Sequence, residues 1–430
     1  MADIRPFRAL RYDLARLPAA QVMTQPYDKI SPAMQENYYT LSPYNLVRII
    51  LGRRQDGDNV AGNVYTRAAE YGKKWREEGI LKQDSAPSIY RYTQTFRAPS
   101  GNKFERKGFI ALGRVEDYSA QVVYRHEQTL AKPKADRLDL LRATRVHYEQ
   151  LFLLYEDSGE IDQALATTEE PTIDVSDEYG VAHRVWQSSS APVIQAVQAR
   201  MGDQKLVIAD GHHRYETALN FRNECRRGGQ VDAEAPSEFV MMTFVNMNDP
   251  GLLVLPTHRV VHSLGSFSID AFHKSSTELF QVEEVASDLD PARATSLLQE
   301  KGRNRTALLA VAANRALLLS SPKPATSKYL AGLSHRQQSL DVVQLHKVLL
   351  EAVLGLSEES IRNQQNLSYL RDAAEAMEQV RKGQANVAFL LNPCPVEKVR
   401  DIAFAGEVMP QKSTDFYPKL LSGLTAYALD

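Results

Sequence analysis

The sequence has little cysteine, no excess of charge of either sign and no long apolar run. Its two cysteines, Cys225 and Cys394, have no neighbours at metal-ligand spacing, which argues against a disulfide framework or a structural zinc site. The formal net charge of −2 does not indicate a general nucleic-acid-binding protein. No uncharged apolar run reaches the roughly 18 residues of a membrane span, and the charged amino terminus lacks the apolar core of a signal peptide. We therefore expect a cytoplasmic protein whose partners are small molecules.

The order of the expected elements indicates two domains of mixed structure. The chain has 430 residues and is 43% hydrophobic, which is enough for sizeable cores. Before about residue 260, hairpins mix with helices, and "SIYRYTQTF" with "ERKGFIALGRVEDY" predicts one such hairpin. After residue 261, helices alternate with strands. We predict an α+β chain with a phosphate-binding catalytic domain over 1–260 and an α/β accessory domain over 261–430, whose C-terminal tail could fold back on the site.

The stretch "KLVIADGHHRYETALNF" predicts a strand, a tight turn and a helix with hydrogen-bond donors at the turn. The strand should end at Asp210, Gly211 permits a positive φ, and the helix should start near His212. The first amides of a helix have no partners inside it and carry the positive end of its dipole, so they suit an anion. His213 and Arg214 add donors, and arginine can hold a phosphate through two parallel bonds. The alternative is that Asp210 only caps the helix and the histidines pack or face water.

A metal site is a second alternative at the same turn. His212 and Glu216 are four residues apart and share one face of the expected helix. No third ligand is evident nearby in the sequence, so a metal-dependent hydrolase remains the lesser hypothesis.

The turn also resembles a known phosphate-binding element. "DGHHRY" is similar to the phosphate-binding turn of the ParB/sulfiredoxin superfamily, and Asp210 through Arg214 match its form in free-serine kinases. His212 stands where sulfiredoxins have their reactive cysteine, so the resemblance does not extend to their reductase chemistry. The whole chain resembles an uncharacterised bacterial and archaeal family that carries such a motif, through the landmarks "PYDKI", "PYNLVR", "RHEQT", "ADRLDLL", "PTHRVV" and "MPQKSTDFYPK".

This resemblance implies a ParB/sulfiredoxin-like first domain and a kinase activity. A phosphoryl group would pass from ATP, ADP or pyrophosphate, with Mg²⁺, to an alcohol, and free L-serine giving O-phosphoserine is the implied reaction. The superfamily also implies an alternative, a nucleotide-binding switch that handles DNA as ParB does. Such proteins follow the nucleotide domain with a helix-turn-helix and a basic face, whereas strands alternate with helices after residue 260 here.

A second polar segment follows a strand that should end near Tyr124. "RHEQTLAKPKADRLDLL" would place His126 and Glu127 on a loop, where either could act as a general base toward an alcohol. Lys132 and Arg137 could neutralise phosphate charge. The alternative is a solvated loop that ends at a helix cap on Asp136.

Two further sites involve single polar residues near the amino terminus. Asp28 lies in the proline-framed turn "TQPYDKISP", where its carboxylate could position or deprotonate a substrate hydroxyl, or could simply shape an Asx-turn. Asn45 and Arg48 fall at an expected strand start and could contact substrate, although a structural role is the alternative.

The last candidates lie in the second half of the chain. His258 and Arg259 follow an expected strand and could bind a carboxylate or phosphate, or form a structural ion pair. Lys412, Ser413 and Thr414 resemble the end of a Walker A loop, but proline and glutamine precede them where a free amide and glycine are needed, so they form no P-loop. They could still hold phosphate if this tail folds back, or the tail could be a surface clamp.

Overall fold

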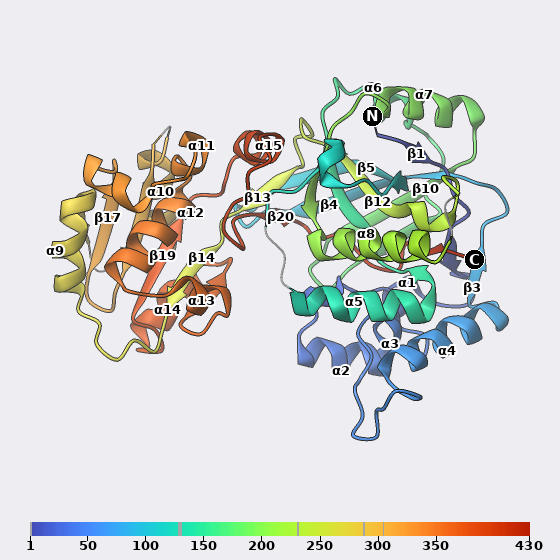
Figure 1. The fold of residues 1–430 in the computed structure, drawn as a ribbon, viewed down its shortest axis with the longest axis horizontal. Helices are drawn as coiled ribbons and strands as arrows, with labels where there is room; N and C mark the ends of the chain where they lie inside the picture. The colour runs from blue at the N-terminus through green and yellow to red at the C-terminus, as the bar shows by residue number, and fades with distance from the viewer. Residues whose placement is uncertain (1, 128–130, 230–231, 287–288, 304) are drawn as a thin grey trace. The chain divides into compact units, whose positions relative to one another are not determined.

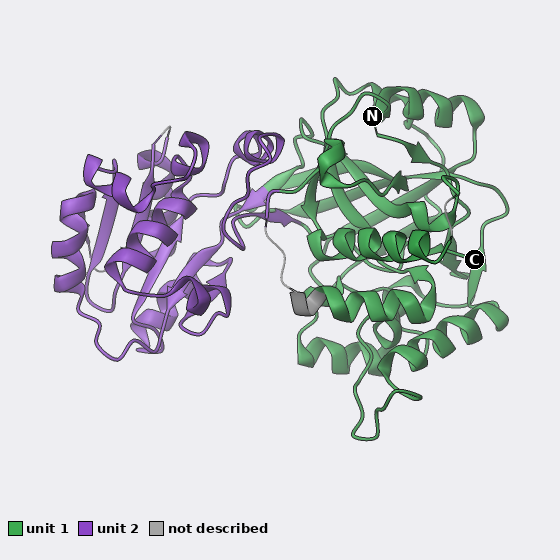
Figure 2. Cartoon of the chain, in the orientation of Figure 1, with its two compact units in different colours: residues 1–125, 129–253, 418–430 green, residues 126–128, 254–417 purple. Residues whose placement is uncertain are grey.

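The computed structural model describes residues 2–127, 131–229, 232–286, 289–303 and 305–430, which form two compact units (Figure 2). Unit 1 contains residues 1–125, 129–253 and 418–430, and unit 2 contains residues 126–128 and 254–417. The last 13 residues thus return to unit 1, so neither unit is one continuous segment. Within the described ranges, no helix is long and apolar enough to cross a membrane.

Unit 1 is built on a mixed sheet (Figure 1). Its strand order is β6–β11–β8–β12–β5–β4–β10–β9, and β1 pairs with β5. The predicted hairpin is confirmed, because β4 (Ile89–Arg97) and β5 (Lys103–Arg114) pair in antiparallel fashion. The other strands of the sheet are β1 (Ile4–Arg5), β6 (Val123–Tyr124), β8 (Leu151–Tyr155), β9 (Ile173–Ser176), β10 (Ala182–Ser188), β11 (Leu206–Asp210) and β12 (Phe239–Asn246). Its short outlying strands are β2 (Leu10–Tyr12), β3 (Leu81–Gln83), β7 (Val146–His147) and β21 (Tyr427–Ala428).

Helices cover both faces of this sheet. In Figure 1, α8 and α5 run side by side, α4 packs against α5, and α7 lies beside α6 and β1. Apolar side chains of α7 and α8, such as Val197 and Ala218, join the sheet's core, where burial of apolar surface stabilises the unit. The helices are α1 (Ala19–Val22), α2 (Pro32–Leu41), α3 (Val47–Ile50), α4 (Val64–Glu77), α5 (Ala131–Thr144), α6 (Glu160–Ala164), α7 (Ala191–Met201) and α8 (His212–Arg227), with 3₁₀ turns η1 (Tyr27–Lys29), η2 (Tyr118–Ala120) and η3 (Pro236–Glu238).

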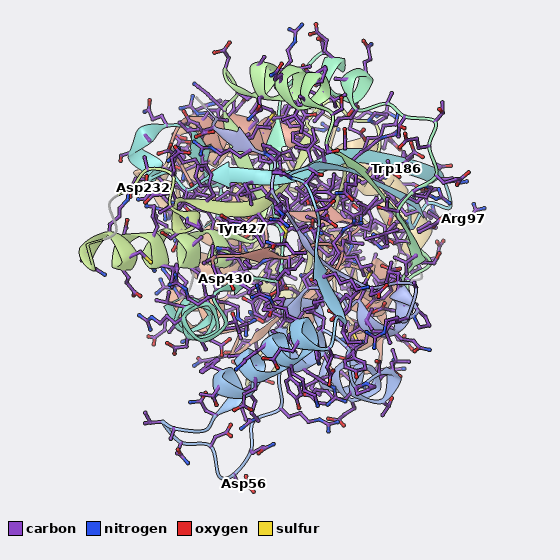
Figure 3. The ribbon with its side chains drawn as sticks, turned by 90° about the vertical axis from the view of Figure 1, so that its right-hand side faces the viewer. Asp56, Arg97, Trp186, Asp232, Tyr427 and Asp430 are labelled. Atoms are coloured by element: carbon purple, nitrogen blue, oxygen red, sulfur yellow. The ribbon has the colours of Figure 1, made fainter. Side chains whose placement is uncertain are left out.

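The C-terminal tail is part of the packed interior of unit 1. Leu420, Leu424 and Leu429 are buried, and the Tyr427 hydroxyl donates to the carbonyl of Pro236 over 3.2 Å. Figure 3 shows Tyr427 and Asp430 among the elements of this unit. The idea of a surface clamp therefore does not describe the last residues, which fill core positions.

Unit 2 contains a six-stranded sheet in the order β15–β17–β16–β19–β14–β18. The α/β prediction holds for the alternation of helices and strands but not for strand direction, since every strand pair described in this sheet is antiparallel. A tight connection between β16 and β17 makes a hairpin, which parallel strands cannot form. The strands are β14 (His258–Val261), β15 (Gln281–Val285), β16 (Ala307–Val311), β17 (Ala316–Ser320), β18 (Leu367–Leu370) and β19 (Val387–Leu391).

The helices of unit 2 include one rare form. The amphipathic segment "SLDVVQLHKVLLEAVLG" forms the short α12 (Asp341–Val343) followed by the π-helix η5 (Gln344–Val353). The others are α9 (Ile269–Leu279), α10 (Pro291–Lys301), η4 (Pro324–Tyr329), α11 (His335–Gln338), α13 (Glu358–Arg362), α14 (Ala373–Arg381) and α15 (Val396–Phe404), and the remaining strands along the chain are β13 (Leu253–Leu255) and β20 (Asp415–Tyr417).

Candidate active site

The predicted strand, turn and helix form around Gly211. β11 ends at Asp210, Gly211 has a φ of 94°, and α8 begins at His212. A Cβ atom on Gly211 would lie 3.0 Å from Leu151 Cδ2 and 3.2 Å from Arg214 Nη2, so both the backbone angle and the available space favour glycine. Gly211 is itself the N-cap residue, and no side chain caps the helix. The alternative that Asp210 caps α8 is therefore wrong.

Asp210 instead fixes two cations at the turn. Its Oδ1 accepts a bond from Lys419 Nζ over 3.1 Å and its Oδ2 accepts one from Arg214 Nη2 over 3.0 Å. Burial opposes ionisation of Asp210, but the charges of Lys419, Arg214 and Lys29 outweigh it and hold the pKa of the carboxyl well below its usual range. Arg214 Nη1 also donates to the carbonyl of Gln150 over 2.6 Å. The Arg214 guanidinium is thus held in one orientation beside the start of α8.

A buried carboxylate links this turn to Asp28. Glu149 Oε1 accepts the backbone N–H of Tyr27 over 3.0 Å, which ties down the 3₁₀ turn η1 that carries Asp28. Burial raises the pKa of Glu149, although the charges of Arg214 and Arg137 oppose the rise. Burial lowers the pKa of Arg214, and the charges of Glu149, Asp210 and Asp28 reverse this to a net rise. We call Asp28, Glu149, Asp210, Arg214 and Lys419 the turn cluster.

The cavity beside the turn cluster is small. A cavity of about 50 Å³ is lined by Arg137, Glu149, Arg214, Thr217 and apolar neighbours such as Leu151. At about 10–15 Å³ for each water centre, this space takes a few waters and no nucleotide. Asp28, in contrast, is exposed. A large ligand would therefore contact the open side of the turn.

Arg137 belongs to the scaffold around this site. It lies within α5, so the loop expected for Arg137 and a helix start at Asp136 are both wrong, whereas His126 follows β6 outside any helix or strand, as expected. Its Nη1 donates to the carbonyl of Ile50 over 2.6 Å, and its guanidinium carbon lies 4.1 Å from the centre of the Tyr27 ring. Arg137 thus packs against the Tyr27 ring of η1. The side chain of Lys132, the other predicted cation of this segment, lies outside the described residues.

Glu216 does not join a metal site. It forms ion pairs with Lys134 over 2.8 Å and with Arg125 over 3.4 Å. Across the parts of the chain that the structure describes, no group of three or more His, Cys, Asp or Glu side chains could hold a metal ion. These contacts give the hydrolase hypothesis no support.

Asn45 holds the backbone and does not start a strand. Its side chain is fully buried, its Nδ2 donates to the carbonyl of Gln21 over 2.8 Å, and its Oδ1 accepts the N–H of Val47 over 3.0 Å at the start of α3. Asn45 thus ties the residues before α3 to Gln21, while the N-cap residue of the helix is Leu46. We therefore leave Asn45 out of the proposed site.

A second set of predicted residues meets within unit 2. His126 Nε2 lies 2.9 Å from Thr414 Oγ1, and Glu127 Oε1 accepts the N–H of Lys412 over 3.2 Å. Ser413 turns back to bond the carbonyl of Pro410. The structure thus brings His126 and Glu127 to the 412–414 segment, as a set of their own, while the turn cluster lies within unit 1.

His258 and Arg259 follow strand β13, as expected, but they are themselves the first two residues of strand β14. Their exposed fractions are 4% and 1%, so we leave both out of the proposed site. His258 Nδ1 accepts the N–H of Leu391 over 3.2 Å. Arg259 donates to the carbonyl of Lys412 over 3.0 Å, and burial lowers its pKa to about 10. Arg259 therefore fixes the backbone of the 412–414 segment.

The buried His258 is expected to make unit 2 sensitive to acid. Burial, followed by the charge of Arg259, lowers its pKa to about 4, below the ordinary value of 6.5. The folded chain then binds fewer protons than the unfolded chain. The contribution of His258 to the free energy of unfolding is complete above about pH 6.5. It is lost as the pH falls toward 4, by up to about 3 kcal/mol. Urea unfolding at pH 7.5 and pH 5 should show this loss, and His258→Gln should reduce it. An equal loss in the variant would assign the effect to other groups.

Sequence patterns did not single out Glu149, and they left the partner of Lys419 undetermined. Glu149 stands in "HYEQLFLLY", immediately before a strand that is expected to be buried, and Lys419 stands in "YPKLLSGL" between apolar residues. A charged residue next to an apolar run is a usable signal, because buried charges are normally paired. The pairing itself joins residues 209 positions apart and can be seen only in the fold.

A comparison with protein families identifies the family of this chain. A family model described as "Protein of unknown function (DUF1015)" matches residues 4–343. The chain belongs to this DUF1015 family. A search of curated proteins found no match to the DUF1015 protein.

A comparison with solved structures matches the chain weakly to several proteins. A free serine kinase variant in complex with AMP is 13% identical, with 69% of this chain and 84% of that chain covered and a TM-score of 0.35. A second variant of free serine kinase, in complex with ADP, is 13% identical over the same shares with a TM-score of 0.34. SbnI from Staphylococcus aureus, with a C-terminal truncation, is 11% identical, with 74% of this chain and 88% of that chain covered and a TM-score of 0.36.

Proposed function

We propose that this protein is a phosphotransferase whose donor phosphates bind at the start of α8. The observation that carries this proposal is the fixed Arg214 guanidinium beside the Gly211 turn. The amides that open α8 and this guanidinium supply donors for phosphate oxygens on one side of the turn. Lys29 adds positive charge, since it acts electrostatically on Asp210, and His213 is the second residue of α8. Phosphoryl transfer depends mainly on such alignment and charge neutralisation.

We assign to Asp28 the role of the base that takes the proton of the acceptor hydroxyl. Its exposed carboxylate acts electrostatically on Arg214, so an alcohol at Asp28 would lie close to phosphates held at the turn. In the step, the acceptor oxygen bonds to the terminal phosphorus, the bond to the leaving phosphate oxygen breaks, and the hydroxyl proton passes to Asp28. Glu149 positions η1 and so holds Asp28 in place. Glu127, with His126, remains the second candidate for this base.

Mg²⁺ was expected with a nucleotide or pyrophosphate donor. Both carboxylate oxygens of Asp210 already bond to Lys419 and Arg214, and the described residues contain no group of three metal-ligating side chains. Asp210 is therefore engaged by two cations, and we derive no step through the ion.

The experiment that tests the proposal is a screen for phosphorylated product. ATP, ADP and pyrophosphate are each offered with L-serine, the acceptor that the turn's resemblance to free-serine kinases implies, and with other small alcohols. Phosphorus NMR and mass spectrometry identify the product. Formation of O-phosphoserine supports the proposal in full, whereas hydrolysis of the donor without any phosphorylated alcohol contradicts it.

Arg214→Ala is expected to weaken donor binding about 30-fold, because hydrogen bonds to a charged group contribute about 1.5–3 kcal/mol. Calorimetric titration of the donor measures the effect. Arg184→Ala is the control, because Arg184 on β10 pairs with Asp174 on β9 and its side chain is 38% exposed. If the affinity of Arg214→Ala equals that of the control, the turn does not bind the donor.

A further inference from the structure

A second cavity in unit 1 lies among α2, α3 and α4. Its volume is about 330 Å³, which falls within the range of ligand sites, about 300–1,000 Å³. Its lining includes the guanidinium groups of Arg48, Arg53 and Arg67 and the rings of Tyr39 and Tyr71. The loop after α3 borders it, and Figure 3 shows Asp56 of this loop at an outer end of the unit. The cavity therefore combines positive charge with aromatic surface.

Arg48 is the residue that points to a ligand. Its Nη2 donates to the carbonyl of Tyr39 over 2.9 Å, and its guanidinium carbon lies 4.4 Å from the centre of the Tyr39 ring. Its Nε is buried without a hydrogen-bond partner, and among the described residues no carboxylate pairs with this side chain. A buried donor without an acceptor costs about 1–3 kcal/mol. An anion that accepts from Arg48 would remove that cost.

The carboxylates near this cavity neutralise only part of the charge of its arginines. Arg67 is bound by Asp58, with Nη2 to Oδ2 at 3.1 Å, and its Nη2 also donates to the carbonyl of Arg53 over 2.9 Å. Arg53 pairs with Glu36, but these side chains are 44% and 62% exposed, so the pair is weak and can rearrange. The Arg53 guanidinium carbon lies 4.0 Å from the centre of the Tyr39 ring. Three cations thus face two carboxylates, of which only Asp58 is firmly placed.

We propose that this cavity binds a small organic phosphate, with its phosphate on Arg48 and Arg53 and its organic part against Tyr39 and Tyr71. A phosphate supplies more acceptor oxygens and more charge than a carboxylate, which fits two adjacent guanidinium groups. The tyrosine rings offer an apolar surface to the rest of the molecule. This site is separate from the turn cluster and goes beyond the proposed transferase activity.

The test is made in the Arg214→Ala background, so that the turn cluster does not contribute. AMP, inorganic phosphate and malonate are titrated by calorimetry at low salt. AMP is expected to bind, and Arg48→Gln should weaken its binding at least tenfold. Arg91→Gln is the matched control, because Arg91 also lies over an aromatic ring, 4.8 Å from the centre of Trp186, in the same unit, and its removal should change affinity less than twofold.

The outcomes are distinct from those of the kinase proposal. Arg48→Lys keeps the charge but lacks the planar pair of donors, so an intermediate affinity for AMP supports the proposed geometry. Thermal unfolding shows whether each variant is folded. Absence of AMP binding in the Arg214→Ala background overturns the proposal. Equal binding by Arg48→Gln, or malonate binding as tight as that of AMP, also overturns it. None of these results depends on whether the protein transfers a phosphoryl group.

Discussion

Replacing Asp28 by asparagine is expected to lower the rate of phosphorylated product formation about 1,000-fold, within the range that general bases contribute. Asparagine keeps the size of the side chain and its acceptor oxygen, so η1 should keep its shape. The amide cannot take the proton of the acceptor hydroxyl, however, and donor affinity should stay within about twofold, because Asp28 does not supply a phosphate contact. Steady-state rates with saturating donor, together with calorimetric donor affinity, measure both quantities.

Glu127→Gln is the control for this prediction. Glu127 bonds the backbone N–H of Lys412 within unit 2, and glutamine can still accept that bond. Its turnover should stay near that of the unchanged protein. A large loss in Glu127→Gln combined with full activity in Asp28→Asn would move the base to Glu127 and contradict the assignment made here.

Replacing Lys419 by methionine is expected to lower the free energy of unfolding by about 3 kcal/mol, as for other buried pairs that lose one partner. The Lys419 side chain is 8% exposed and its ammonium is 3.1 Å from Asp210 Oδ1. Methionine has a similar length, so the loss reports mainly on the charge left at Asp210. Urea unfolding of both proteins at pH 7 gives the difference.

Two further variants separate charge from packing. Lys82→Met removes a lysine that is 2.6 Å from Asp13 but 61% exposed, and it should cost less than about 1 kcal/mol. The double variant Asp210→Asn with Lys419→Met removes both charges and should recover part of the stability. If Lys82→Met costs as much as Lys419→Met, or if the double variant is no more stable than Lys419→Met, the buried ion pair does not stabilise this turn.

The local structure of the turn was predictable because it depends on neighbouring residues. "KLVIA" forms a buried strand, glycine follows it with a positive φ, and the helix starts directly after this glycine and ends at Arg227, before Gly228. The hairpin of β4 and β5 has the same basis, since alternating β-branched and aromatic residues on both sides of a short polar turn favour it. Family membership was also foreseeable, because landmark segments along the chain carry the resemblance.

The wrong predictions for polar residues share one physical cause. Arg137, His258 and Asn45 are polar residues that the sequence placed at element ends, where polar groups often have functional roles. Arg137 lies inside α5, His258 starts β14 and Asn45 lies just before α3, and each bonds a backbone group from a distant segment, such as Ile50 for Arg137 and Leu391 for His258. Local patterns show that a side chain is polar, but they do not show which distant carbonyl or amide it will meet.

The sequence by itself determined the Gly211 turn, the helix that follows it and the presence of Arg214 at its start, because these depend on backbone angles, spacing and side-chain type within a few residues. Only the tertiary structure decided that Asp210 holds Lys419, that Glu149 anchors the turn of Asp28, and that Arg48 is left with a buried donor. Those contacts join residues that are far apart in the chain, and they exist because packing removes water from charged groups, which must then find partners wherever the fold brings them together.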